Sequence, residues 1–153
     1  MPGPLPDVAA GHSVPRQGAI AEPEAWHRLV ICGRPEQVGV ARGFVRQVLG
    51  ASHPGIERVT LLTSELVTNS VTHSASRLDG GIIVVMVRSA ADRVRVEVTD
   101  DGGPTAPTLR CDDDLAEAGH GLRLVEAYSL SWDYYRDGPR TVTWFECVPE
   151  PLA

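Results

Sequence analysis

The chain has 153 residues, 42% of them hydrophobic and 22% charged, and a formal net charge of −6. This length and composition are typical of one globular domain with its own core. The negative charge disfavours a surface for nucleic acid or for anionic membranes, and no run of about 18 apolar residues could form a membrane-spanning helix.

The cysteines bear on where the protein works. Cys32, Cys111 and Cys147 are widely spaced and form no C-x-x-C pair. The N-terminus shows no basic segment followed by an apolar one. Together these features predict reduced thiols and a cytoplasmic location.

The chain begins with a Pro- and Gly-rich stretch that has no apolar period, so residues 1–24 are predicted to be a disordered tail before a domain at 25–150. Residues 26–32 predict a strand. Residues 34–50 predict a helix, because Pro35 suits a first helical turn. The apolar face of that helix consists of Val38, Ala41, Phe44, Val45 and Val48.

A second helix is predicted over residues 57–77, where apolar residues recur at steps of three and four: Val59, Leu62, Leu66 and Val67. Glu65, Asn69 and His73 are each four apart, so they form one polar stripe beside the core face. Burying such groups costs free energy unless they are hydrogen-bonded or bind something. The plain alternative is a core helix with satisfied polar groups.

The rest of the chain continues with hairpins and one further helix. Residues 82–87 predict a strand buried on both faces, and the strict alternation at 93–100 predicts a half-buried antiparallel strand. The segment 105–118 is long and polar, which is typical of a lid. Then come a helix opened by Gly119-His120-Gly121-Leu122 and a hairpin of strands at 130–135 and 141–148.

This order of elements predicts an α/β fold. The helices can all lie on one face of a sheet whose strands are mostly joined by hairpins. We therefore expect a two-layer α/β sandwich with a mixed, mainly antiparallel sheet and helices on one face.

Three of these elements carry groups suited to a nucleotide. The oxygen of an Asn side chain suits Mg²⁺, and a carboxylate one turn earlier could take a proton from an attacking hydroxyl. Asp100 at a strand end could accept a hydrogen bond from an exocyclic amine, and the glycines after it let the backbone approach a ring. Gly119-x-Gly121 at a helix start offers N–H groups to phosphate. Taken singly, each feature is weak: Asp-Gly-Gly is more often a turn than a ligand site, and Gly-x-Gly before a helix is a common cap or turn.

Taken in order, these motifs resemble those of the GHKL superfamily, which includes the ATPase domains of gyrase, histidine kinases and related chaperones. SELVTNSVTHS is similar to its N box, VEVTDDGG to its G1 box, GHGL to its G2 box and RTVTWFE to its final strand. The resemblance implies the Bergerat ATP-binding fold. The small size is similar to that of anti-sigma-factor serine/threonine kinases.

The resemblance implies ATP and Mg²⁺ as ligands, with Glu65 as general base and Asn69 as metal ligand. Asp100 accepts from the adenine amine, Thr141 supports it through water, and Gly102 lies near the ring. The remaining nucleotide contacts that it implies are His73, Gly119, His120, Gly121 and Leu122.

Two departures leave alternatives open. With Asp100 as the G1 aspartate, Pro104 replaces the second glycine, whereas counting from Asp101 puts Thr105 there. The valine alternation favours Asp100 as the strand end. No lysine lies between Gly102 and Gly121, so Arg110 or Arg123 must supply positive charge to the phosphates.

Three functional hypotheses follow. The first is an ATP-dependent serine/threonine kinase, weak or dependent on its partner, that phosphorylates an anti-anti-sigma antagonist and sequesters a sigma factor. The second is a nucleotide-binding module that holds a partner protein without turnover. The third is a structural domain without nucleotide. The resemblance also allows a homodimer, and it implies no nucleic acid or membrane partner.

Overall fold

The computed structural model describes residues 25–103 and 117–152, with the side chains of 117–121 outside this description. The predicted tail at 1–24 and most of the predicted lid at 105–118 also lie outside it, so the division into tail and domain stays a prediction. The elements are β1 (His27–Cys32), α1 (Gln37–Leu49), α2 (Ile56–His73), the short 3₁₀ helix η1 (Ala75–Arg77), β2 (Ile82–Ser89), β3 (Val94–Asp100), α3 (Glu117–Tyr128), β4 (Ser131–Asp137) and β5 (Arg140–Cys147).

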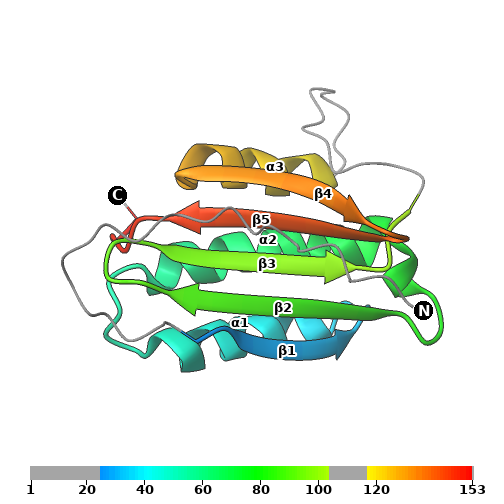
Figure 1. The fold of residues 1–153 in the computed structure, drawn as a ribbon, viewed down its shortest axis with the longest axis horizontal. Coiled ribbons are helices and arrows are strands. Elements are labelled where there is room, and N and C mark those ends of the chain that lie inside the picture. The colour runs from blue at the N-terminus through cyan, green and yellow to red at the C-terminus, as the bar shows by residue number, and fades with distance from the viewer. Residues whose placement is uncertain (1–24, 104–116, 153) are drawn as a thin grey trace, which may run out of the picture.

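The five strands form one sheet in the order β1-β2-β3-β5-β4, and all four neighbouring pairs are antiparallel. The predicted two-layer α/β fold is confirmed, with the helices on one face of the sheet (Figure 1). The sequence predicted a mixed, mainly antiparallel sheet, whereas the described strands pair only in the antiparallel direction. The crossover through α3 makes β3 and β4 run in the same direction, but β5 lies between them and is antiparallel to both.

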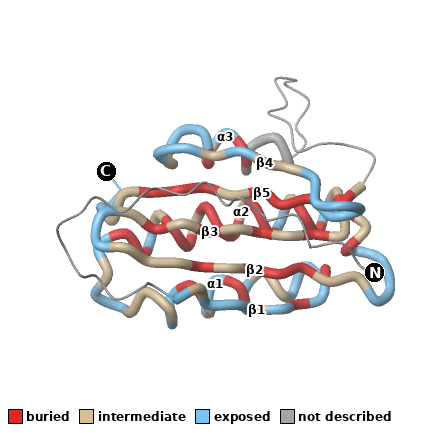
Figure 2. The backbone as a smooth tube through the Cα atoms, in the orientation of Figure 1, coloured by how far each residue is buried: buried red, intermediate tan, exposed pale blue. Residues whose placement is uncertain are grey.

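The core lies between the sheet and the helices. The valines of β3 that alternate in the sequence, Val94, Val96 and Val98, all point to the helix side and are buried. They pack with apolar residues of β2 and with Leu62, Leu66 and Phe145 in one cluster. Figure 2 shows this burial concentrated in the central strands and in α2, while the outer elements are more exposed. The apolar faces of the strands, which repeat every two residues, pack on the apolar faces of the helices, which repeat every 3.6 residues. Burial of these faces is the main contribution to stability.

The strand β2 was predicted to be buried on both faces, and most of its apolar residues are buried. Ile83, Val85 and Val87 are fully buried on the helix side. On the opposite face Val84 is buried and Met86 is half-buried. No helix of the described residues covers that face.

The helix α2 ends four residues before the predicted end at Arg77. Ser74 adopts an extended backbone, its N–H still donates to the Ser70 carbonyl, and its Oγ accepts from the N–H of Ser76. A serine that bonds to the backbone two residues ahead offers an alternative to continuing the helix. The chain therefore turns into η1 and reaches the start of β2.

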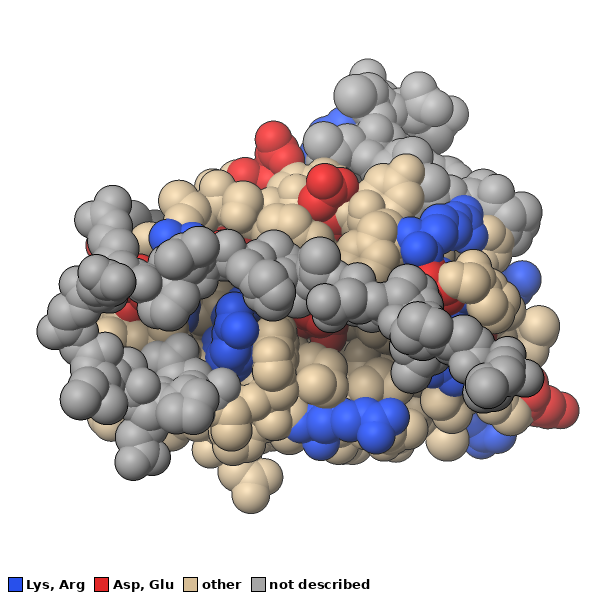
Figure 3. All heavy atoms as spheres, in the orientation of Figure 1, with Lys and Arg blue, Asp and Glu red and all other residues tan. Residues whose placement is uncertain are grey.

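The helix-free face of the sheet carries a network of charges centred on Glu146. This carboxylate is buried and accepts from Arg93 at 2.9 Å and from Arg95 at 3.1 Å. Arg95 also bonds to Glu97 at 3.0 Å and stacks on the ring of Trp144. Where Figure 3 shows this face, positive and negative side chains are interspersed.

Among the described residues, no helix combines the length and the apolar character that a membrane span requires.

Candidate functional site

The site is built around Asp100, the last residue of β3. Its carboxylate is buried on the helix side of the sheet, where Oδ2 accepts from the Ser70 hydroxyl at 2.7 Å and Oδ1 accepts from the Gly102 N–H at 2.8 Å. Burial raises the pKa of the Asp100 carboxyl above its ordinary value. The two hydrogen bonds and the positive charge of Arg136 partly offset this rise, while the negative charge of Asp101 adds to it.

The structure gives Asp101 a different position. Its Oδ2 accepts from the Ile82 N–H at 2.9 Å, and its own N–H donates to Ser76 Oγ at 2.8 Å. Ser76 in turn donates to the Ile82 carbonyl at 2.6 Å. Asp101 therefore fastens η1 to the beginning of β2. Of the two aspartates left open by the sequence, Asp100 faces the helices and Asp101 is part of the scaffold.

Thr141 lies beside Asp100 as the motifs predicted. The two are direct partners in the β3–β5 register, and Thr141 is buried. Arg136 is the partner of Thr141 in the β4–β5 register. Directly opposed residues point to the same side of a sheet. Asp100, Thr141 and Arg136 therefore form one row across the sheet on the side of the helices.

The predicted polar stripe runs along the flank of α2. Glu65, Asn69 and His73 are all half-buried. Arg58 lies seven residues before Glu65, which is almost two full turns, and so shares this flank. The Arg58 guanidinium donates to the Tyr128 carbonyl at the end of α3, at 3.1 Å. The stripe is therefore on the side of α2 that carries α3.

Ser70 is a site residue that the motif comparison missed. It follows Asn69 directly and lies four residues beyond Leu66, on the face of α2 that packs on the sheet. A hydroxyl at a core-facing position of an amphipathic helix signals a buried hydrogen bond, so the helical period alone could have identified it. It links the helix of the polar stripe to the aspartate of the sheet.

Gly102 is required by its neighbours in the fold. Its φ is 74°, in the left-handed region, and a Cβ added there would lie 2.1 Å from the Pro139 carbonyl oxygen. Pro139 belongs to the turn between β4 and β5. The structure shows that Gly102 makes room for the hairpin turn, and its place near a ring stays a prediction.

The motif at 119–122 does not open a helix as predicted. The helix α3 begins at Glu117, so Gly119, His120 and Gly121 lie within its first turns. The side chain of His120 lies outside the described residues, and Leu122 is buried in the core. Arg110 also lies outside them, while Arg123 is exposed on α3.

This arrangement has the chemistry of a site for a ring that carries an amine. A buried carboxylate accepts hydrogen bonds strongly, and two hydroxyls, of Ser70 and Thr141, lie beside it. A carboxylate and a carboxamide lie on the flank of α2. The described residues hold no cluster of three or more His, Cys, Asp or Glu able to bind a metal ion alone.

Comparisons with known proteins match most of the chain. Residues 31–146 match the family model described as histidine kinase-like ATPase domain. Serine-protein kinase RsbW of Oceanobacillus iheyensis is 31% identical over 109 residues, which cover 61% of this chain and 68% of the relative. RsbW of Bacillus subtilis is 31% identical over 108 residues, which cover 61% of this chain and 67% of the relative.

A solved structure shares the fold. The crystal structure of the RsbU and RsbW domains of a Mycobacterium tuberculosis protein superposes with a TM-score of 0.53 at 20% identity. The match covers 83% of this chain, which spans about a third (34%) of that longer chain.

Proposed function

Because this chain belongs to the histidine kinase-like ATPase domain family, we propose that it binds Mg²⁺-ATP between α2 and the helix side of the sheet and controls a partner protein. The observation that carries the proposal is the buried Asp100 carboxylate, held by Ser70 and Gly102 at the end of β3. A buried acceptor of this kind costs free energy in an empty scaffold and gains a partner when an amine binds.

In this proposal the adenine amine donates to Asp100, and Thr141 supports the contact through water. Gly102 and His73 lie at the base end of the nucleotide. The first turns of α3 hold the phosphates, where helix N–H groups suit anions. The motif assigns Gly119, His120, Gly121 and Leu122 to this role. Because α3 begins at Glu117, only Gly119 of these four lies among the first N–H groups, which have no partner within the helix.

Asn69 is the residue that would hold Mg²⁺. A half-buried carboxamide provides one neutral oxygen, and Mg²⁺ needs few protein ligands when phosphate oxygens and water complete its shell. The absence of a larger acidic cluster among the described residues therefore fits a metal that arrives with the nucleotide. When bound, the ion neutralises phosphate charge.

Glu65 would act as the general base of a serine/threonine kinase. In that step the acceptor hydroxyl oxygen forms a bond to the γ-phosphorus, the bond from this phosphorus to the β–γ bridging oxygen breaks, and ADP leaves. The hydroxyl proton passes to the Glu65 carboxylate. The relatives named serine-protein kinase support this choice of reaction. The second candidate is a binder that holds ATP and its partner without transfer, favoured by the lack of a lysine between Gly102 and Gly121.

The proposed partners are a sigma factor and an anti-anti-sigma antagonist protein in the cytoplasm, which rests on the likeness to RsbW. A homodimer also stays a prediction, which light scattering can check. Co-purification from the native cell, with and without ATP, would identify the partner.

The direct test is calorimetry of ATP binding, with and without Mg²⁺, on wild type and two variants. Asp100→Asn should weaken binding by roughly 5- to 150-fold. The asparagine amide has one neutral acceptor oxygen, and it puts an NH2 donor in the place of the second carboxylate oxygen. Asp101→Asn is the matched control and should bind like wild type, since Asp101 belongs to the scaffold. Wild-type affinity in a folded Asp100→Asn protein would refute the assignment.

A further inference from the structure

The backbone that follows Asp100 is held from three directions. The Gly102 N–H donates to Asp100, and the Gly102 carbonyl accepts from the Ala75 N–H at 2.6 Å. The Gly103 carbonyl accepts from Nη1 of Arg136 at 3.0 Å. A Cβ at Gly103 would lie 3.1 Å from the His73 carbonyl, so this backbone lies close against the end of α2. We call residues 102–103 the glycine wall.

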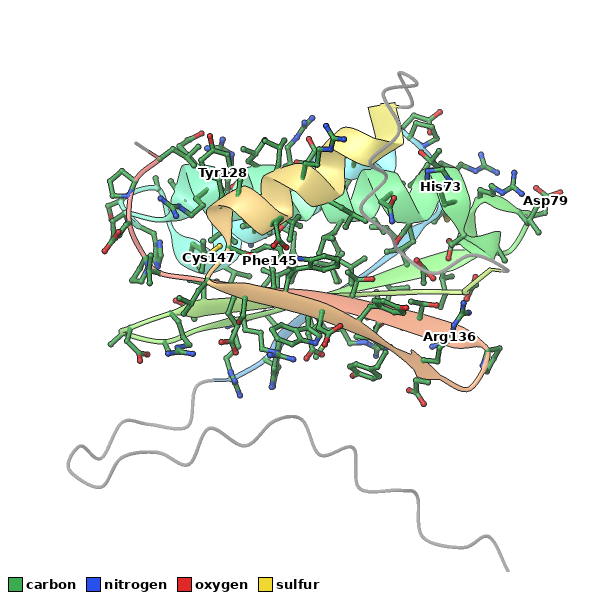
Figure 4. The ribbon with its side chains drawn as sticks, turned by 90° about the horizontal axis from the view of Figure 1, so that it is seen from above. His73, Asp79, Tyr128, Arg136, Phe145 and Cys147 are labelled. Atoms are coloured by element: carbon green, nitrogen blue, oxygen red, sulfur yellow. The ribbon has the colours of Figure 1, made fainter. Side chains whose placement is uncertain are left out.

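Arg136 supplies the contact from the sheet. It comes from β4, the edge strand, and its side chain crosses Thr141 in the row that ends at Asp100. Figure 4 shows Arg136 and His73 at the same end of the molecule, with Tyr128 and Cys147 at the other. The glycine wall thus lies between the sheet and α2 at this end.

The hydrogen bond from Arg136 to Gly103 lies outside the hydrophobic core. Arg136 is exposed, and none of the ion pairs formed among the described residues includes it. A guanidinium that donates a charge-assisted hydrogen bond to a backbone carbonyl fixes the position of that carbonyl. Here the fixed group is the carbonyl of Gly103, three residues after Asp100.

We propose that Arg136 is a positioning residue for nucleotide binding, which ties the β4–β5 hairpin to Gly103 and so holds the glycine wall beside Asp100. This rests on the proposed function. The gain comes from preorganisation, because a wall that is already fixed loses less conformational freedom when the base binds. Arg136 acts at the base end, so its effect does not depend on the number of phosphates.

The test compares Arg136→Met, which keeps the apolar stem but loses all donors, with Arg136→Lys and with Arg140→Met. Arg140 is an exposed arginine at the other end of the same turn and is the matched control. We expect Arg136→Met to weaken Mg²⁺-ADP and Mg²⁺-ATP by the same factor, roughly 5- to 10-fold. Arg136→Lys should recover part of the loss, and Arg140→Met should bind like wild type.

A second measurement reports on the wall itself. The Ala75 N–H donates to Gly102, so its hydrogen exchange should become faster in Arg136→Met and stay unchanged in Arg140→Met. Wild-type exchange and wild-type affinity in Arg136→Met would overturn the proposal. A loss that is larger for ATP than for ADP would also overturn it, since Arg136 would then act on the phosphates. If wild type binds no nucleotide while Ala75 exchange still rises only in Arg136→Met, the proposed function fails and the tie to the wall stands.

Discussion

At the scale of single residues, Glu65 and Asn69 share a flank of α2 but have different proposed roles. Asn69→Ala should weaken Mg²⁺-ATP binding and reduce transfer together, because it removes a metal ligand. Glu65→Ala should leave binding near wild type and reduce transfer by about 10²- to 10⁴-fold, the usual contribution of a general base. Calorimetry and slow ATP hydrolysis measure the two effects.

Both substitutions introduce alanine, so neither should disturb the helix. If Glu65→Ala lowers affinity as much as Asn69→Ala does, Glu65 is a binding residue and its role as base is wrong. If wild type shows neither hydrolysis nor transfer to a purified partner, the second candidate function, a nucleotide-binding module without turnover, is the correct one.

The raised pKa of Asp100 predicts two opposite pH dependences. The folded protein binds this proton more tightly than the unfolded chain, so the stability it contributes is complete below the ordinary pKa of 3.8 and is lost as pH rises through the folded pKa. Compared with Asp100→Asn, wild type should therefore lose stability over that interval. ATP affinity should change the other way, weakening as pH falls through the folded pKa, because a protonated carboxyl is a poorer acceptor.

Urea unfolding of wild type and Asp100→Asn across acid pH, with calorimetry of ATP on the wild type, checks both trends. The difference between the two proteins cancels the titration of all other carboxyls. A stability difference that does not vary with pH would show that Asp100 titrates alike in the folded and unfolded chains.

At the scale of elements, the hydroxyl of Ser76 links η1 both to β2 and to the residue after β3. Ser76 Oγ accepts from Asp101 and donates to Ile82, and the side chain is buried. Ser76→Ala should lower the free energy of unfolding by about 2–3 kcal/mol, because it leaves a part-buried N–H and a part-buried carbonyl without this partner. Chemical denaturation measures the loss.

Thr72→Ala is the control for that prediction. Thr72 is also a hydroxyl residue near the end of α2, but it is exposed and bonds only to the Thr68 carbonyl of its own helix. Its loss should change stability by less than about 0.5 kcal/mol. Equal losses in the two variants would contradict a special role for Ser76.

The elements themselves were largely predictable from the sequence. Alternation located β3 to the residue at its carboxyl end, since Val94, Val96 and Val98 all face the core. The 3.6-residue period located α2 but not its end, because the side chain of Ser74 ends the helix through a local bond that periodicity does not record. The start of α3 was misplaced by two residues, since Gly119 was taken to open a helix that begins at Glu117.

The sequence predicted those residues of the candidate site that are marked by their place at the end of a strand. It did not predict the residues that join the site through contacts between distant elements. Asp100 and Thr141 were identified from motifs at strand ends, and the register pairs them. The contact of Ser70 with Asp100 crosses 30 residues, and that of Arg136 with Gly103 crosses 33. Such contacts follow from how α2 and the hairpin are packed, which one sequence does not give.

At the scale of the whole molecule, the two faces of the sheet are stabilised differently. Apolar packing against helices covers one face, and the charge network around Glu146 spans the other. Glu146→Leu should lower the free energy of unfolding by about 3 kcal/mol, because Arg93 and the largely buried Arg95 both lose this carboxylate, and Arg95 is left with Glu97 alone. Thermal and chemical unfolding measure the effect.

Asp92→Leu is the matched control, since Asp92 is also paired with an arginine of this network. That pair is 3.7 Å apart, and the Asp92 side chain is 78% exposed. Exposed pairs contribute little, so the expected loss is below about 1 kcal/mol. A comparable loss in both variants would argue that the network acts through general charge balance and not through the buried Glu146.

The close approach of Gly102 to the hairpin turn has a consequence for how this sequence can evolve. A side chain at 102 would meet the Pro139 carbonyl oxygen 2.1 Å away, although 37 positions separate the two residues. Position 102 therefore cannot accept a side chain while the turn keeps its backbone path, whereas the contact sets no limit on the side chain at 139, because the atom involved is a backbone carbonyl oxygen. Descendants of this sequence that acquire a larger residue at 102 must also remodel the turn at 138–139, so glycine at 102 should be inherited wherever the turn keeps its length and backbone path.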